Sequence, residues 1–222
     1  SRTYNKVMIM YWCALKMEEL IKARLIKSDL IEILKQFELY ILKDMSSIIL
    51  LKQALICIAN LVDFERTMRI IYNEHRNLSS AFNEMYAEYE FAKYIRNKFV
   101  GHIKIELLTK AIEWKPELRY LIHKTNEPKI MFLYNIWILE TTINSFVDSN
   151  GKHKIFNSDT DLIYPPDYQR FINFLTKTIK SAIEYLNILD AILYISIEEN
   201  EKIESIEHWL LAGQTSFKYI KK

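Results

Sequence analysis

The sequence predicts an all-α fold, and three observations support this prediction. The chain of 222 residues contains only 3 glycines and 4 prolines, whereas ordinary usage is roughly 7% and 5%. A β-sandwich or an α/β fold of this size needs many more turn residues. Half of the residues are hydrophobic, and most recur at spacings of three and four. We therefore expect a multi-helix bundle with a sizeable core.

The charge and the cysteines exclude several classes of protein. A net charge of +2 is too weak by itself to indicate nucleic-acid binding, so any RNA site would be a local patch. Cys13 and Cys57 lie in apolar helical contexts and are expected to be buried thiols. No zinc-ligand or disulfide pattern is present, and no signal peptide is visible. We expect a cytoplasmic protein with no cofactor and no metal.

The first half of the chain contains three predicted helices. The first covers about residues 5–43, with a break at Ser28, where a capped restart is expected. After a break at 44–47, in which Ser46 or Ser47 is the candidate N-cap, the second covers about 48–74. Its first half is apolar nearly all round, so it should lie in the centre of the bundle or in a dimer interface. The third is expected to start near Ser80 and to cover about 81–100, ending at Gly101.

Shorter helices and one long helix are predicted for the second half. They cover about 103–114, a short piece beginning at Pro116 and ending near 123, then 129–148 and 168–197, the last capped by Asp167. Residues 152–166 have no helical period and are the best candidate for a mobile or partner-binding segment. No linker divides the chain, so we expect one domain over residues 1–222. The tail glutamates are expected to form a solvated acidic face rather than a metal site; they are Glu198, Glu199, Glu201, Glu204 and Glu207.

Chemically useful side chains are concentrated at the end of the third predicted helix. Arg96, Asn97 and His102 lie within seven residues. A histidine can take a proton from a hydroxyl or give one to a leaving oxygen. An arginine presents a charged fork of donors to phosphate oxygens, and a neighbouring amide can support either group. A metal-independent ribonuclease needs these groups, because RNA supplies the 2′-hydroxyl as its own nucleophile.

Helix geometry sets a condition on this interpretation. On an ideal α-helix, residues six apart lie about 120° from one another. Arg96 and His102 can share a site only if Gly101 ends or kinks the helix, or if long side chains wrap a cleft. A symmetric partner that supplies a second copy of the motif would ease the requirement.

The segment from Arg96 to His102 resembles the signature of the HEPN superfamily, in which an arginine and a polar residue precede a histidine by four to six residues. The resemblance is greatest to HEPN proteins of bacterial abortive-infection and toxin–antitoxin systems. It covers about residues 5–105 as a helical pattern, with about 106–222 as a helical extension. It implies a homodimer with two motifs facing a cleft, an endoribonuclease activity and, in several members, neutralisation by a nucleotidyltransferase-type antitoxin. Other members are non-catalytic binding domains.

The bare motif is weak, because the chain contains two copies. Arg69 and His75 have the same spacing as Arg96 and His102. We prefer the second copy because Asn97 follows its arginine and a small residue precedes its histidine. That small residue, Gly101, departs from the alanine that others keep and could loosen the helix at His102.

These considerations give a set of predicted site residues and two main hypotheses. The predicted catalytic residues are Arg96, Asn97 and His102, and the predicted RNA-binding residues are Lys93, Lys98 and Lys104. Asp63 is a candidate to orient Arg96 or His102; the alternative is an exposed carboxylate or one paired with Arg66. The main hypothesis is a homodimeric defence ribonuclease. The alternative is a non-catalytic helical module that dimerises through residues 48–62 and binds protein or RNA, and a bundle unrelated to HEPN is a third.

Overall fold

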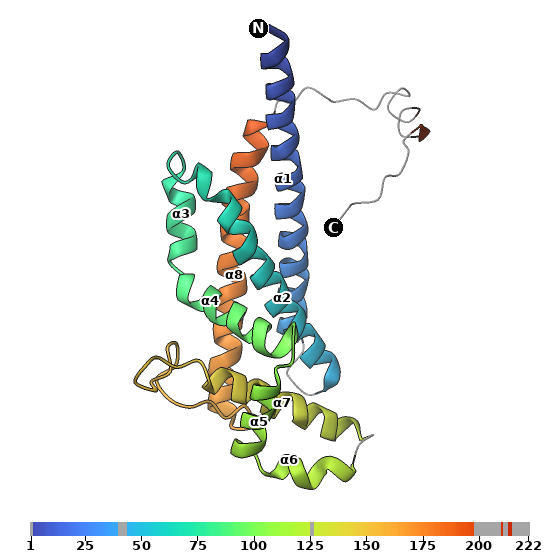
Figure 1. Cartoon of the computed structure of the whole chain (residues 1–222), viewed down its shortest axis with the longest axis vertical. Coiled ribbons are helices and arrows are strands. Elements are labelled where there is room, and N and C mark those ends of the chain that lie inside the picture. Colours follow the sequence, from blue (N-terminus) through green and yellow to red (C-terminus); the bar gives the residue numbers. More distant parts are fainter. Residues whose placement is uncertain (1, 40–43, 125–126, 198–209, 211–212, 215–222) are drawn as a thin grey trace.

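A computed structural model describes residues 2–39, 44–124, 127–197, 210 and 213–214, with the backbone alone for 2–16 and 38–39 (Figure 1). In these ranges the regular structure is helical, apart from one isolated bridge between Val147 and His153. The α-helices are α1 (Arg2–Leu39), α2 (Met45–Met68), α3 (Arg76–Asn83), α4 (Tyr86–Ile95), α5 (Ile105–Trp114), α6 (Glu117–Tyr120), α7 (Pro128–Asn144) and α8 (Pro165–Ser196). Three tighter or wider turns join them: η1 (Arg69–Ile71), η2 (Arg96–Val100) and η3 (Leu121–His123). The predicted all-α fold is confirmed.

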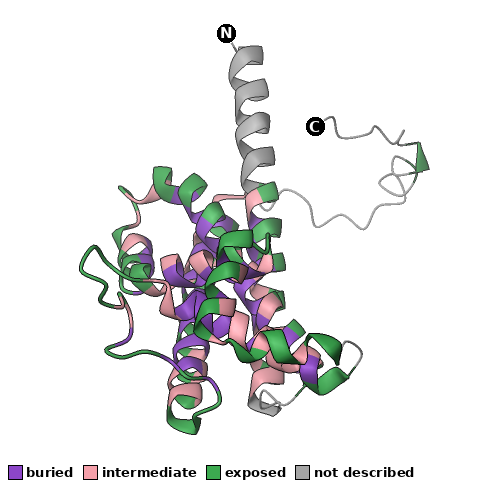
Figure 2. Cartoon of the chain, turned by 60° about the horizontal axis from the view of Figure 1, so that its bottom comes forward, coloured by how far each residue is buried: buried purple, intermediate pink, exposed green. Residues whose placement is uncertain are grey.

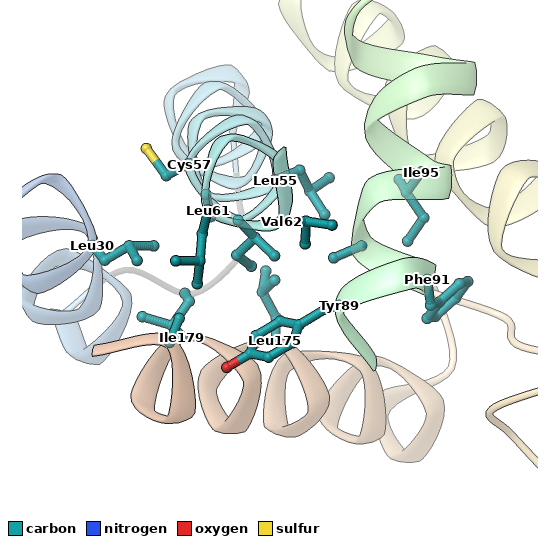
Figure 3. Packing of buried hydrophobic residues seen from close by; sticks show 14 of the residues in the cluster. Leu30, Leu55, Cys57, Leu61, Val62, Tyr89, Phe91, Ile95, Leu175 and Ile179 are labelled. Carbon is teal, nitrogen blue, oxygen red and sulfur yellow. The ribbon is translucent and has the colours of Figure 1, made fainter. Parts of the chain in front are cut away.

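The central element is α2. Its apolar side chains are buried on nearly every side, including Ile48, Leu51, Leu55, Ile58 and Leu61, each with no exposed surface. They pack against α1, α4, α7, α8 and η2, and Figure 3 shows Leu55, Leu61 and Val62 between the helices that surround them. The segment Met45–Ile71 is long and apolar enough to cross a membrane, but 56% of its apolar window is buried inside the bundle. Of the two predicted places for this helix, the centre of the bundle is the one observed; dimerisation through residues 48–62 stays a prediction.

The long helices α1 and α8 run antiparallel and form the largest helix–helix contact (Figure 1). Asp190 of α8 accepts hydrogen bonds from Arg24 Nε at 3.0 Å and Lys27 Nζ at 2.5 Å on α1. The buried stripe of α8 belongs to the same hydrophobic cluster as α2 and α4. The residues after 105 therefore do not form a single appendage. α8 completes the bundle, while α5 to α7 lie at one end (Figure 1), where α5 and α6 are mostly exposed and α7 is mostly buried or half-buried; Figure 2 shows the burial of the whole chain.

In the first half of the chain one predicted break and one predicted cap are wrong, while residues 40–43, where the first predicted helix was expected to end, lie outside the described ranges. α1 continues through Ser28, whose hydroxyl donates to the Leu25 carbonyl at 2.8 Å. A serine hydroxyl can hydrogen-bond a backbone carbonyl of its own helix, so a serine can lie in the interior of a helix as well as at its cap. α2 begins at Met45, and its N-cap is Asp44 rather than Ser46 or Ser47. Asp44 accepts from the Ser47 backbone N–H at 3.0 Å, and Ser47 completes the capping box.

The predicted helix over 81–100 is also wrong, because it is divided. α3 already begins at Arg76, not near Ser80, and the chain bends at Met85 before α4 starts. The bend lets α3 pack on α8 and α4 pack on α2, so both apolar faces are buried. The ring of Phe82 stacks on Tyr89 across the bend, with centroids 4.8 Å apart.

The start of α8 and the loop before it are held by local hydrogen bonds. α8 begins at Pro165 with Tyr164 at the N-cap position, so the predicted cap at Asp167 is wrong and Asp167 lies in the first turn. The amide of Asn144 both donates to and accepts from the Thr160 backbone, at 2.9 and 2.8 Å. Phe156 and Leu162 are buried in the core. The segment 152–166 therefore packs on the bundle through several anchors.

His153 is the most constrained side chain of this loop. Its Nδ1 accepts the backbone N–H groups of Ile155 and Phe156 at 3.0 and 2.8 Å. Nε2 therefore holds the proton and donates to the Ile143 carbonyl at 2.9 Å. The ring also stacks on Phe156, with centroids 5.1 Å apart. Burial lowers the pKa of His153 below its usual 6.5, and Arg170 acts in the same direction.

We predict that His153 makes the stability of the fold depend on pH. The folded protein holds the ring neutral, so the unfolded chain takes up the proton first as the pH falls. The stabilisation is complete above about pH 6.5 and decreases as the pH falls below that value. His153→Asn keeps an acceptor near Nδ1 but cannot titrate, and it should cost about 1–3 kcal/mol at pH 7.5. In urea unfolding, its deficit against wild type should shrink at pH 5.5, and parallel pH profiles would contradict the assignment.

Candidate functional site

The predicted motif lies on a π-helical turn. η2 covers Arg96–Val100, and the Gly101 backbone N–H donates to the Arg96 carbonyl at 2.7 Å, five residues earlier. An ordinary α-helical bond would span four residues. Such wide turns are rare and are frequent at functional sites. Phe99 is buried here and anchors the turn against the bundle.

The wide turn brings Arg96 to the residue that precedes His102. A Cβ atom on Gly101 would lie 3.5 Å from both Cζ and Nη1 of Arg96, so the guanidinium lies against the Gly101 backbone. Consecutive Cα atoms are about 3.8 Å apart, which places His102 immediately beyond. The helix ends here, and residues 102–104 have no regular structure. The condition that Gly101 ends or distorts the helix is therefore met, and the His102 side chain is exposed.

The guanidinium of Arg96 is only partly satisfied. Its Nη1 donates to Oδ1 of the exposed Asn97 at 2.9 Å, which keeps two predicted residues together. Its Nε is buried and has no hydrogen-bond partner. Among the described residues, Nε of Arg170 is also buried without a hydrogen-bond partner. The charge of Arg170 is neutralised, however, because its Nη2 lies 3.2 Å from Oδ1 of Asp167. No ion pair to a described carboxylate involves Arg96, so its charge is available to an anion.

The first copy of the motif has a structural role instead. Arg69 donates from Nε and Nη2 to the carboxylate of Glu65, at 2.9 and 3.0 Å. Glu65 is 1% exposed and also accepts from the Tyr72 hydroxyl at 2.8 Å. Arg69 thus neutralises a buried carboxylate, and His75 lies at the start of α3. This arrangement favours the copy that contains Arg96.

Asp63 and Lys93 are each other's partners. The Lys93 ammonium donates to Asp63 at 2.5 Å, and Arg66 lies 3.8 Å from the same carboxylate. The Asp63 side chain is 57% exposed, and the Lys93 side chain is 14% exposed. The pairing with Arg66 is the arrangement foreseen as the alternative for Asp63, and the structure brings Asp63 to neither Arg96 nor His102. An orienting role for Asp63 and RNA binding by Lys93 stay predictions.

Lys98 and Lys104 lie together on the other flank of η2. They line a cavity of about 220 Å³ with Tyr94 and Lys110. The Lys98 ammonium lies 6.0 Å from the centre of the Tyr94 ring, and the Tyr94 hydroxyl is hydrogen-bonded, at 3.0 Å, to the hydroxyl of Ser145, the C-cap residue of α7. The three predicted lysines therefore point in two directions, with Lys93 toward α2 and the other two toward α5 and α7.

Lys110 was not among the predicted site residues. The sequence shows that Lys110 lies in the first amphipathic helix after the motif. It does not show that Lys110 lines a cavity, because Ser145, which lines the same cavity, is 35 positions later. Only the packing of α5 on α7 brings these elements together.

The metal and thiol predictions concern residues both inside and outside the described ranges. Within the described residues, no group of three or more His, Cys, Asp or Glu side chains could hold a metal ion. The acidic residues from Glu198 to Glu207 lie outside the described ranges, as does the side chain of Cys13. Cys57 is buried as predicted, and burial together with Asp29 raises the pKa of its thiol to about 11.

Comparison of the chain with protein-family models, with curated proteins and with solved structures finds no match. The resemblance to the HEPN superfamily thus depends on the residues from Arg96 to His102 and on the helical pattern before them.

We predict that the two arginines differ in their effect on folding. Arg69→Ala leaves the buried Glu65 with only the Tyr72 hydroxyl, and should lower the free energy of unfolding by about 1–3 kcal/mol. Arg96→Ala removes no ion pair and should change it by less than about 1 kcal/mol. Urea unfolding at pH 7.5 measures both values. Equal losses would show that Arg96 is also a structural residue.

Proposed function

We propose that this chain is a HEPN-type, metal-independent endoribonuclease of a bacterial defence or toxin–antitoxin system. His102 acts as the acid/base, Arg96 clamps the phosphate and Asn97 supports Arg96. The observation that supports this most strongly is the guanidinium of Arg96, which forms no ion pair with a described carboxylate and is held by a wide turn against the residue before His102. Nη1 of Arg96 is hydrogen-bonded to the exposed Asn97, and the Nη groups of such a guanidinium can donate to the oxygens of a phosphate.

The proposed reaction uses the RNA's own 2′-hydroxyl. Neutral His102 takes the 2′-proton as this oxygen attacks the adjacent phosphorus. The bond between phosphorus and the 5′-oxygen breaks, and that oxygen receives a proton from an imidazolium. Arg96 stabilises the extra negative charge on the phosphoryl oxygens in the transition state. The products are a 2′,3′-cyclic phosphate and a 5′-hydroxyl.

A homodimer would give this reaction both proton-transfer groups. In a monomer, a single His102 would have to serve as both base and acid. It would pass the proton taken from the 2′-hydroxyl to the leaving 5′-oxygen or to solvent. A twofold pairing supplies a second His102 as the acid while the first acts as the base. Asn97 and His102 are exposed and can reach a partner. In the cytoplasm, a nucleotidyltransferase-type antitoxin that covers the face with Asn97 and His102 would block RNA cleavage.

The decisive experiment is RNA cleavage in EDTA. We expect the wild-type chain to cleave total tRNA or mixed RNA and to leave cyclic phosphate ends. Arg96→Ala and His102→Ala should each lower the rate by at least about 100-fold, because each removes a group that acts in the transition state. Arg119→Ala/His123→Ala removes the same two residue types from exposed positions on α6 and η3, and should cleave like wild type.

Two outcomes would contradict the proposal. Cleavage that survives both single substitutions would place the activity elsewhere or in a contaminant. Failure of wild type to cleave any RNA, as the purified homodimer and after removal of any co-purified partner, would favour the second candidate.

The second candidate is the non-catalytic helical interaction module, and exposed apolar side chains favour it. Met17, Ile21 and Leu25 form a stripe on one face of α1, at four-residue spacing, with 44%, 51% and 62% exposure. A second apolar surface lines a cavity of about 280 Å³ between α5, η3 and α7. Contiguous apolar surface on a small protein often marks an interface.

We predict that the α1 stripe forms the homodimer contact of such a module. Ile21→Gln/Leu25→Gln should convert a dimer to a monomer in size-exclusion chromatography with light scattering, without lowering the melting temperature. The matched control is Ile49→Gln/Ile70→Gln, which changes two isoleucines that are 63% and 84% exposed elsewhere on the surface. The control should remain a dimer. A monomeric wild type, or a dimer in every variant, would exclude this contact.

A further inference from the structure

Two cavities adjoin one another on the side of the bundle formed by α4, α5 and α7. The smaller, of about 220 Å³, contains Lys98 and Lys104, and the larger has a volume of about 650 Å³ and contains Trp114. Lys110 and Ser145 line both cavities, so the two form one continuous depression. Neither cavity includes Arg96 or His102.

The smaller cavity is suited to an anion. Lys98, Lys104 and Lys110 face it with a single carboxylate, Glu106, which leaves a net charge of +2 on the lining. Lys110 also pairs with Glu113 at 3.0 Å, but both side chains are about half exposed. An exposed pair of this kind is weak, and its lysine can turn to a bound phosphate at little cost.

The larger cavity is suited to a flat, neutral group. Its two lysines, Lys110 and Lys115, are balanced by Glu140 and Asp159. Lys115 is already held by the buried Glu140 at 2.7 Å. The carboxylate of Asp159, on an exposed residue, disfavours phosphate here and can accept N–H groups of a base edge.

Trp114 supplies an aromatic surface in that cavity. It is 42% exposed, although a tryptophan usually buries most of its area. The Lys110 ammonium lies 5.3 Å from the centre of its ring, at the junction with the smaller cavity. Cationic side chains beside an exposed aromatic ring are the recurring arrangement for binding a nucleotide without reading its sequence.

We propose that this depression is a binding site for a phosphorylated nucleoside. The phosphate binds among Lys98, Lys104 and Lys110, and the base stacks on Trp114 in the larger cavity. The ligand is either a residue of a single-stranded RNA or a free nucleotide. The site goes beyond the proposed cleavage, because it uses neither Arg96 nor His102 and can bind even if the chain cleaves nothing.

Binding is tested with full-length protein containing Arg96→Ala/His102→Ala, so that no probe is cleaved. A fluorescein-labelled single-stranded oligouridine is titrated by anisotropy at several salt concentrations. Lys104→Gln/Lys110→Gln should weaken binding at least fivefold and lower the salt slope by about 0.7 for each lost phosphate contact. Trp114→Ala should weaken binding about tenfold with an unchanged salt slope, and Trp114→Phe should restore most of it.

The control and the competitors separate the outcomes. Lys177→Gln/Lys180→Gln removes the same charge from two exposed positions on α8 and should bind like the parent protein. Displacement of the probe by AMP and UMP indicates a free-nucleotide site, whereas displacement only by unlabelled oligonucleotide indicates an RNA strand. Both results support the proposal. No binding, or a loss in the Lys104→Gln/Lys110→Gln variant no larger than in this control, would overturn it, as would a Trp114→Ala variant that binds normally.

Discussion

The structure depends on the burial of α2. Its apolar residues cover nearly the whole circumference, so no single neighbour can remove them from water, and at roughly 25 cal/mol per Å² this burial is the largest favourable contribution available to the fold. The elements that pack on α2 include α1, α4, α7, α8 and η2. Of these, α1 and α8 pack along their length on each other, and Asp190, whose side chain is only 17% exposed, pairs there with Arg24 and Lys27. The remaining neighbours, α4 with η2 and α7, meet at the end where the motif lies.

This arrangement gives the motif its geometry. The last turn before Gly101 must keep Ile95 and Phe99 in the core, where they are 0% and 2% exposed. The Lys52 ammonium of α2 lies 4.7 Å from the centre of the Phe99 ring and donates to Asn135 of α7, which ties three elements together at this point. Burial lowers the pKa of Lys52. With these anchors fixed, the extra residue of the π turn is accommodated on the solvent side, which is where Arg96 and Asn97 lie.

The parts of the fold that could be predicted are those set by local pattern. The helical class, the central position of α2 and the helix end at Gly101 follow from apolar periodicity and from the scarcity of turn residues. The wrong boundaries have a common cause, since Ser28 and Ser80 are compatible with both a cap and a helix interior, and the choice depends on neighbours far along the chain. The same holds for the depression beside Lys98. Tyr94, Trp114 and Ser145 come together only because α5 folds back on α7, and a periodic pattern does not specify a helix's neighbour.

The two copies of the arginine–histidine motif can be distinguished by the residue that lies four positions before each arginine. Four positions before Arg69 stands Glu65, within reach on the same helical face, and the ion pair between them is formed. Four positions before Arg96 stands Ala92, whose side chain has no hydrogen-bond acceptor and no charge. The same spacing therefore gives one arginine with a neutralised charge and one whose charge is available. A motif search that asks which arginine lacks a carboxylate at the preceding turn separates the copies from sequence alone. The criterion is physical, because an arginine that already neutralises a buried glutamate cannot clamp a phosphate without leaving that glutamate unpaired.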